Sequence, residues 1–435
     1  MYRTEVPLYG DLVDIVNSVD NTVLSSRGLT KSDLPPRHEL ERHGAIRLGT
    51  AQEMRLISRL FGIMGMYPVG YYDLHMVGFP LHGTAFRPTT EGALRKNPFR
   101  VFTTVLRPDL ITDVSLRRTS MEILSKRVLF THRLCQLMTQ IESGSLPKES
   151  TDEFISESLK IFKWHARSTV PKETYLRLRR EHPVVADIVC FPSAHINHLT
   201  PRTLDIDAVQ AEMISRGLPA KECIEGPPGG RKCQILLRQT SFKALEERVM
   251  FVNDAHDLEG THTARFGEVE QRGAAVTRKG RELYDKLLAS AMFQRQGRDE
   301  DILTETFKEY PDDWADLRKQ GLVYFRYKVA EGSKPPQQEE VQMEELIGSG
   351  VIEYEPITYE DFLPLSAAGI FTSNLGESNG SKKSGTLEAT TNSRKVLEDL
   401  LGCSIPVEMD LYQKLQSDSL VECEKALGVK ISLAA

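Results

Sequence analysis

Two histidines three positions apart, His195 and His198, stand in the segment AHINHLTPRTLDID at residues 194–207. A neutral imidazole is the commonest metal ligand in proteins, because either ring nitrogen can bind the ion. A Thr-Pro turn and an amphipathic helix, predicted at 208–216, follow the two histidines. We therefore interpret this segment as a short strand, a turn and a helix that can hold a metal ion.

A third histidine lies in the segment ELERHGAIRLGT, where polar residues alternate with apolar ones. This alternation predicts a strand, in which successive side chains point to opposite faces. His43 and Arg47 then share one face. An arginine in a pocket can bind a carboxylate through two parallel hydrogen bonds. Arg87 and Arg202 are further candidates for this role, and a surface position or an internal ion pair is the alternative for each arginine.

A carboxylate for the same site comes from the segment ARFGEVEQRG. Glu268 and Glu270 share one face of a predicted strand, so the sequence alone leaves both open. With His43 and His198, either would complete a set of two histidines and one carboxylate. Such a set is typical of non-haem Fe(II) enzymes, whereas a structural zinc needs a fourth protein ligand. His195 and His198 have opposite parity on a strand, so only one should face the site, and a hydrogen-bonded or surface position remains the alternative for each histidine.

We find no sequence motif that supports other catalytic chemistries. The segment EGPPGGRK at 225–232 places glycines beside a basic pair, but it lacks the phosphate-loop pattern and is better interpreted as a turn. We find neither a G-x-S-x-G motif nor a dinucleotide-binding fingerprint. The six cysteines form no C-x-x-C pair, which favours reduced thiols over disulfides or a zinc knuckle.

Composition narrows the range of partners. The chain has 55 Lys and Arg against 61 Asp and Glu, and its net charge of −6 gives no broad electrostatic reason to expect nucleic acid or an anionic membrane as a partner. We find no secretory signal and no apolar run long enough to span a bilayer. We therefore expect a cytoplasmic protein, and an organellar location after removal of a transit peptide stays open.

The order of the predicted elements divides the chain into parts. A strand, a helix capped by Thr50 and several strands are predicted at 40–110. The same order is predicted at 188–275, beginning with a short apolar strand at 188–191. We expect one catalytic unit over residues 1–435. Its other parts are a helical insertion at 111–187 and a helical and mixed C-terminal part at 276–435, with a flexible polar loop at 376–393.

Seven segments follow one another along nearly the whole chain: ERHGAIRLGT, MGMYPVGYYDL, HGTAFRP, HINHLTPRTLDID, LLRQTSFKALEE, ARFGEVEQRG and YEDFLPLSAAGIF. Together they resemble the 2-oxoadipate dioxygenase/decarboxylase family. The resemblance implies an α+β fold of the vicinal oxygen chelate type, in which βαβββ modules form a curled mixed sheet around a metal site, with additional helices. It also implies an Fe(II) enzyme that converts 2-oxoadipate and dioxygen to 2-hydroxyglutarate and carbon dioxide in lysine breakdown.

The same resemblance implies roles for individual residues. The metal ligands that it implies are His43, His198 and Glu268. It assigns the substrate carboxylate to Arg47. It places Leu365 and Ser366 of FLPLSAAG near the substrate, with Leu365 where a valine is expected. The resemblance leaves His195 as a residue around the ligands, and we also expect His82 and Glu270 in this surrounding shell.

Two other functions stay open on the same fold. A metal-dependent isomerase or lyase would work without oxygen, and a non-catalytic protein would bind a small acid without metal. Three candidate ligands argue against the second, because a pure binding protein has no need of an open iron site. Metal analysis followed by an assay without oxygen distinguishes all three functions.

Overall fold

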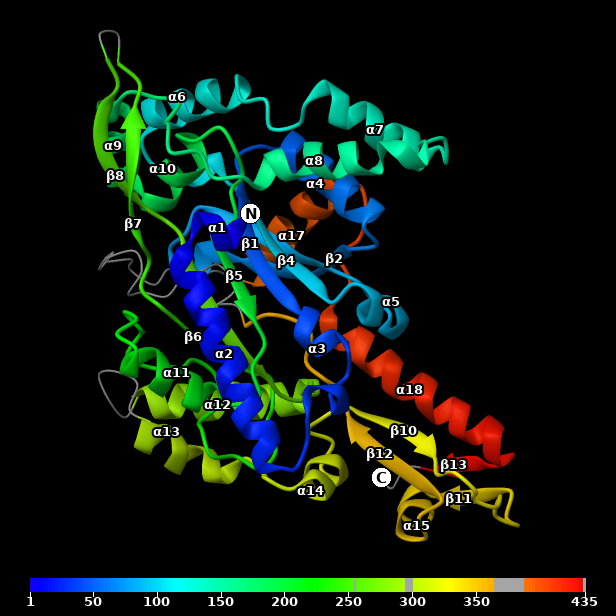
Figure 1. The fold of residues 1–435 in the computed structure, drawn as a ribbon. Helices are drawn as coiled ribbons and strands as arrows, with labels where there is room; N and C mark the ends of the chain where they lie inside the picture. Colours follow the sequence, from blue (N-terminus) through cyan, green and yellow to red (C-terminus); the bar gives the residue numbers. More distant parts are fainter. Residues whose placement is uncertain (254–255, 294–299, 364–386, 433–435) are drawn as a thin grey trace. The chain divides into compact units, whose positions relative to one another are not determined.

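Helices and strands of this chain form a mixed α+β structure (Figure 1), which confirms the predicted fold class. The computed structural model describes residues 1–253, 256–293, 300–363 and 387–432. The chain divides into two compact units. The first consists of Met1–Glu222, Gln239–Glu270 and Phe362–Ile405. The second consists of Cys223–Arg238, Gln271–Asp361 and Pro406–Ala435.

The sheet that carries the predicted ligands has seven strands in the order β2-β3-β4-β1-β5-β9-β6. Strand β1 is parallel to β4 and antiparallel to β5, and β5 is parallel to β9. Three neighbouring strands, β1, β5 and β9, therefore bring together segments that are far apart in the sequence. The strands are β1 (Arg42–Leu48), β2 (Tyr67–Asp73), β3 (Leu81–Arg87), β4 (Phe99–Leu106), β5 (His198–Pro201), β6 (Leu237–Ser241) and β9 (Phe266–Arg272).

The first module runs β1, α4, β2, β3, β4, which is the βαβββ order implied by the resemblance. Helix α4 (Ala51–Ile63) begins with the predicted cap: the Thr50 hydroxyl accepts from the Glu53 amide (3.2 Å), and the Glu53 carboxylate accepts from the Thr50 amide (3.1 Å). Its apolar side packs against one face of β1, where Ile46 and Leu48 are buried. The other face of β1 is left for His43 and Arg47.

The second module runs β5, α11 (Ile206–Ser215), β6, β7 (Glu246–Phe251), β8 (Leu258–Thr263) and β9. It repeats the order strand, helix, strands, but β7 and β8 pair with each other in a separate two-stranded sheet. Only β5, β6 and β9 of this module join the main sheet. The hairpin of β7 and β8 is the long green ribbon in Figure 1.

The predicted strand at 188–191 is wrong. Residues 188 and 189 end helix α10 (Pro183–Val189), whose proline occupies the first helical turn, and residues 190 and 191 follow the helix outside any strand. All residues of α10 after the proline are buried, so the segment reads as a continuous apolar run, and such a run does not distinguish a buried strand from a buried helix. The second module therefore begins at β5.

In the sequence, further helices of the first unit precede the first module, lie within it, connect it to the second module or follow the second module. None of the described helices is both long and apolar enough to cross a membrane. Residues 387–393 of the predicted polar loop belong to a helix, α17, and residues 376–386 lie outside the described residues. The remaining helices of this unit are α1 (Tyr2–Glu5), α2 (Pro7–Ser26), α3 (Arg37–Leu40), α5 (Glu91–Lys96), α6 (Val114–Ser125), α7 (His132–Glu142), α8 (Thr151–Phe162), α9 (Lys172–Glu181) and α17 (Leu387–Leu401).

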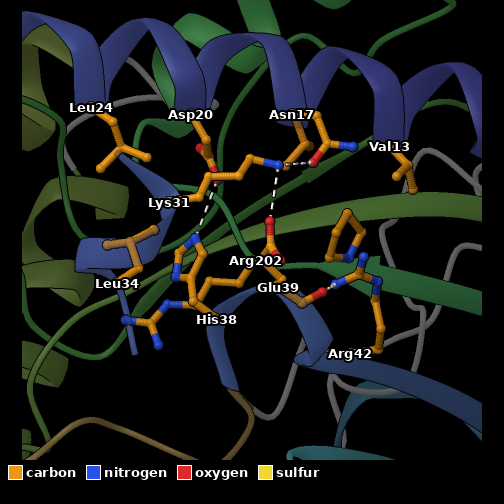
Figure 2. A pocket seen from close by; sticks show the side chains of 12 residues that line it. Val13, Asn17, Asp20, Leu24, Lys31, Leu34, His38, Glu39, Arg42 and Arg202 are labelled. Atoms are coloured by element: carbon orange, nitrogen blue, oxygen red, sulfur yellow. Dashed lines mark hydrogen bonds and ion pairs between the residues drawn. The ribbon is translucent and has the colours of Figure 1, made fainter. Parts of the chain in front are cut away.

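Helix α2 is tied to the start of β1 and the end of β5 by buried polar contacts around a small pocket (Figure 2). Asp20 of α2 accepts from the Thr203 hydroxyl (2.7 Å) and the Leu204 amide (2.8 Å), just beyond β5. His38 of α3, which leads into β1, lies 3.2 Å from the other Asp20 oxygen. These contacts fix the ends of the two strands that carry candidate ligands.

The second unit holds small sheets and helices. Strands β10 (Phe325–Val329) and β12 (Ile352–Pro356) form an antiparallel pair, and β11 (Glu340–Gln342) is parallel to β13 (Lys430–Ser432). Helix α18 packs against β10, where the Tyr327 amide donates to the Ser419 hydroxyl (3.1 Å). The helices of this unit are α12 (Arg278–Phe293), α13 (Glu300–Thr306), α14 (Trp314–Lys319), α15 (Met343–Gly348) and α18 (Glu408–Leu427).

A titratable cap at the start of α10 predicts a loss of stability in acid. His182 Nδ1 accepts from the Val184 amide (3.1 Å), which requires an unprotonated nitrogen. Burial, and next the charge of Arg47, lower the pKa of His182 from 6.5 to about 4. A depressed histidine pKa leaves stability intact above pH 6.5 and removes it as the pH falls towards 4, by at most about 3 kcal/mol.

The expected result is that His182→Asn, which keeps a capping acceptor but does not titrate, loses less unfolding free energy than the wild type between pH 6.5 and 4. Denaturant unfolding at a series of pH values measures this difference. Equal pH slopes for the two proteins would contradict the prediction.

Candidate metal centre

The structure brings His43, His198 and Glu268 together, with one ligand atom of each within 4.8 Å of the others. His43 Nε2 lies 2.9 Å and His198 Nε2 lies 3.7 Å from the same Glu268 oxygen, Oε2. The three residues stand on β1, β5 and β9, and each is at most 1% exposed. Strand pairing produces this cluster. Ala45 of β1 pairs with His198 of β5, and His43 lies two residues before Ala45 on the same face of β1.

The atoms of this cluster fit a divalent metal ion. Both ring nitrogens of His198 and the Oε1 atom of Glu268 are buried and have no hydrogen-bond partner among the described residues. Buried polar atoms without partners are costly, and coordination would satisfy them. Two imidazoles and one carboxylate form the donor set of many non-haem Fe(II) sites. Glu268 is held in place by the Thr200 hydroxyl (3.0 Å) and the Gln239 amide (3.1 Å), both donating to Oε2.

The two histidines differ in their protonation. Burial, together with the charges of His43, Arg47 and Lys221, holds the pKa of His198 well below its ordinary value, so its ring is neutral and ready to bind metal. Burial also acts to lower the pKa of His43, but the carboxylates of Glu270 and Glu268 outweigh it and raise that pKa. A raised pKa favours the protonated ring, so protons compete with a metal ion more strongly at His43 than at His198.

Glu270 has a different place from Glu268, although both lie on the same face of β9. Its Oε2 atom is 3.1 Å from His43 Nδ1, the ring nitrogen that does not face Glu268. Its Oε1 atom accepts from Arg100 (2.8 Å), and Arg100 also lies 3.4 Å from Glu41. A carboxylate bound to the second nitrogen of a ligand histidine fixes the ring and its tautomer. The sequence could not distinguish the two glutamates, because the distinction depends on which one faces His198.

Removal of this support should weaken metal binding. Glu270→Ala is expected to lower metal affinity by about 10- to 100-fold, the range typical of carboxylates that orient a ligand histidine. Glu270→Gln, whose amide oxygen can still accept from His43, should lose less. Competition with a chelator of known affinity measures both variants against the wild type. If Glu270→Ala held metal as tightly as the wild type, His43 would be oriented by other contacts.

Arg47 extends from β1 on the same face as His43 and ends in a buried ion pair. Its NH1 atom donates to Asp187 Oδ2 (2.7 Å). The other Asp187 oxygen lies 3.2 Å from His195 Nε2 and 2.9 Å from His262 Nε2. Burial acts to raise the pKa of Asp187, but the charges of His195 and Arg47 and the hydrogen bonds from His195 and His262 hold it well below its ordinary value. Asp187 is therefore an anion that fixes the guanidinium of Arg47.

His195 thus contacts Asp187 and not the three candidate ligands. Strand β5 begins at His198, so His195 precedes the strand and the parity of strand residues does not apply to it. Its ring packs edge-on against Trp164, with centroids 4.7 Å apart. Asp187 itself was missed in the sequence, and the available signal was a single charged residue inside the apolar run VVADIV.

The remaining candidates lie elsewhere. His82 pairs with Val105 of β4, whereas Arg47 pairs with the preceding residue, Thr104, so His82 points to the opposite face. There it contacts the Tyr71 hydroxyl (3.4 Å). Leu365 and Ser366 lie outside the described residues. Phe362, which the sequence did not single out, packs edge-on against the His43 ring with centroids 4.9 Å apart.

Two other arginines considered for a substrate carboxylate are engaged away from the cluster. Arg202 lies 3.2 Å from the buried Glu41. Arg87 is buried at the end of β3 and donates to the Pro88 carbonyl (3.1 Å). Of the three arginines, Arg47 is the one on the face of β1 that carries His43.

Comparison with known proteins then identifies the family. A family model described as 2-oxoadipate dioxygenase/decarboxylase matches residues 1–374 of this chain. The chain belongs to this family. The family predicted from the sequence motifs is thereby confirmed.

Curated relatives and a solved structure match nearly the whole chain. The 2-oxoadipate dioxygenase/decarboxylase of Escherichia coli (strain K12) is 48% identical over 97% of this chain and 95% of its own length. The relative of the same name from Pseudomonas putida is 45% identical over 99% of this chain and 95% of its own length. The crystal structure of hydroxyglutarate synthase from Pseudomonas putida in complex with 2-oxoadipate has a TM-score of 0.86 and 43% identity, covering 99% of this chain and 96% of that one.

Proposed function

We propose that this protein is an Fe(II)-dependent dioxygenase and decarboxylase that converts 2-oxoadipate and dioxygen to 2-hydroxyglutarate and carbon dioxide. The observation that carries the proposal is the buried set of two histidines and one glutamate in a chain that belongs to the 2-oxoadipate dioxygenase/decarboxylase family. The overall equation balances without a further oxidant or reductant. The substrate itself supplies the electrons that reduce oxygen.

His43, His198 and Glu268 would hold the iron. Bound Fe(II) supplies redox chemistry and a template on which a 2-oxo acid and dioxygen meet. The protein contributes position and charge. The neutral His198 is available as a ligand without losing a proton, and Glu270 and Arg100 keep the His43 ring in one orientation. The Phe362 ring packs edge-to-face against the His43 ring and adds to its burial.

Arg47 would bind the carboxylate at the chain end of the substrate. Its NH1 atom is committed to Asp187, and a guanidinium carries further donors that can meet a carboxylate in a fixed plane. Because Asp187 is itself held by two histidines, its ion pair with Arg47 restricts the guanidinium to one position. A fixed cation of this kind positions the reacting carbons of the bound substrate.

The decisive assay uses protein that has been reconstituted with Fe(II) in the absence of oxygen. On addition of 2-oxoadipate and air, we expect oxygen uptake together with equal amounts of 2-hydroxyglutarate and carbon dioxide. Omission of iron or of 2-oxoadipate should abolish the uptake. An absence of oxygen uptake under complete conditions would refute the proposal, and turnover under strict exclusion of oxygen would instead indicate an isomerase or lyase.

A further inference from the structure

Strand β6 presents one of its faces to the candidate metal ligands. The Gln239 side chain on this strand donates to Glu268 Oε2 (3.1 Å), so the face of β6 that carries Gln239 looks towards the ligands. Ser241, two residues further, lies on that same face. The Phe242 amide donates to the Gly267 carbonyl (3.1 Å), which fixes this end of β6 beside Glu268. The face therefore continues from the ligands to Ser241.

The segment beyond Ser241 carries a buried lysine. Ala220 and Phe242 form an antiparallel bridge, and the Lys221 amide donates to the Ser241 carbonyl (2.9 Å). Neighbouring residues of paired strands project to the same side, so the Lys221 side chain follows Ser241 and Gln239 towards the ligands. Lys221 is only 5% exposed. Its charge also acts on His198, because it is among the groups that lower the pKa of that histidine.

From this placement we propose that Lys221 is a substrate-binding residue that holds one carboxylate of a dicarboxylic 2-oxo acid, while Arg47 holds the other. The inference rests on the proposed function. Arg47 stands on β1 and Lys221 lies beyond β6, so the two cations flank the ligands at opposite sides of the strand order β1-β5-β9-β6. In this arrangement a dianionic substrate would lie between the two cations, with each carboxylate bound to a different one.

The charges near the candidate ligands favour a second cation that binds a substrate carboxylate. The positive charge of Arg47 faces the carboxylate of Asp187, and that of Arg100 faces Glu270 and Glu41. A buried ammonium attracts a carboxylate strongly, because the surrounding protein has a low dielectric constant. The four-carbon stem of a lysine is also long enough to extend across the neighbouring Ser241.

The test compares two ligands on three variants. Fe(II)-loaded protein is titrated calorimetrically under nitrogen with 2-oxoadipate and with 2-oxohexanoate, which has the same chain length but a single carboxylate. The variants are Lys221→Met, Arg47→Met and, as a matched control, Lys243→Met, whose lysine is exposed. Oxygen uptake by the wild type with 2-oxoadipate is measured separately, so failure of the proposed function is distinguished from failure of this inference.

We expect Lys221→Met and Arg47→Met each to bind 2-oxoadipate about 10- to 100-fold more weakly, as loss of a charged hydrogen bond predicts, and Lys243→Met to bind it like the wild type. With 2-oxohexanoate, one of the two variants should match the wild type and the other should not. Unchanged binding of 2-oxoadipate by Lys221→Met would overturn the proposal. So would identical behaviour of both variants towards 2-oxohexanoate, because the two cations would then share one carboxylate.

Folding of each variant is checked by its iron content and thermal unfolding. A buried lysine can be required for stability, so Lys221→Gln is prepared in parallel and is judged by the same two criteria. A variant that retains iron and loses only ligand affinity supports a role in substrate binding. A Lys221 variant that folds, and whose loss of affinity is accompanied by an equal loss of iron, contradicts that role.

Discussion

His198→Ala is expected to abolish stoichiometric iron binding and, with it, oxygen uptake. The residue is one of the three candidate ligands, and both of its ring nitrogens are buried without a hydrogen-bond partner among the described residues. Loss of a direct ligand should exceed the roughly 100-fold loss of metal affinity seen for residues that merely orient ligands. Metal analysis of anaerobically reconstituted protein, after removal of free iron, measures the effect.

The matched control is His195→Ala, three residues earlier in the chain. His195 contacts Asp187 and not the ligands, so this variant should keep its iron. The pair of variants therefore separates a ligand from a nearby buried histidine of the same type. If His198→Ala retained iron while His195→Ala lost it, the assignment of the ligand would be reversed.

Arg47→Ala is expected to keep its iron and to lose turnover, with kcat/KM for 2-oxoadipate reduced by at least about 100-fold. A charged hydrogen bond to a carboxylate contributes roughly 1.5–3 kcal/mol, and misplacement of the reacting carbons adds to its loss. Steady-state oxygen uptake and metal analysis on the same samples measure both quantities. A variant that lost iron and turnover together would show that Arg47 supports the metal centre and not the substrate.

Asp187→Asn tests whether Arg47 must be held in place. The substitution keeps the volume of the side chain but removes the anion that faces Arg47, His195 and His262. We expect KM for 2-oxoadipate to rise while iron content is unchanged. In the double variant with Arg47→Ala, the second substitution should add little, because residues that act through one contact are not additive.

Several of these features could be predicted from sequence patterns, each for a different physical reason. Parity along β9 correctly predicted that Glu268 and Glu270 share a face, because that segment is a regular strand whose two carboxylates flank His43. The capping box of α4 was also visible, since it depends only on residues three positions apart. Local patterns of this kind depend on the backbone alone.

Other features depended on contacts between distant segments and could not be predicted. Asp187 stands in a run that is apolar because α10 is buried on all sides, and this burial made the helix look like a strand. Its partners, Arg47 and His262, are on β1 and β8. The proposed role of Lys221 depends on a bridge between residues 220 and 242, which no local sequence pattern predicts.

The pairing of β1 with β5 has a consequence for the two modules. One ligand, His43, belongs to the first module, while His198 and Glu268 belong to the second. Neither module alone offers a complete set of candidate ligands, so a bound metal ion would link the two modules where β1 pairs with β5. Metal affinity would then depend on how well the two parts of the sheet are joined, and a substitution between β1 and β5 would weaken metal binding even when it lies far from any ligand.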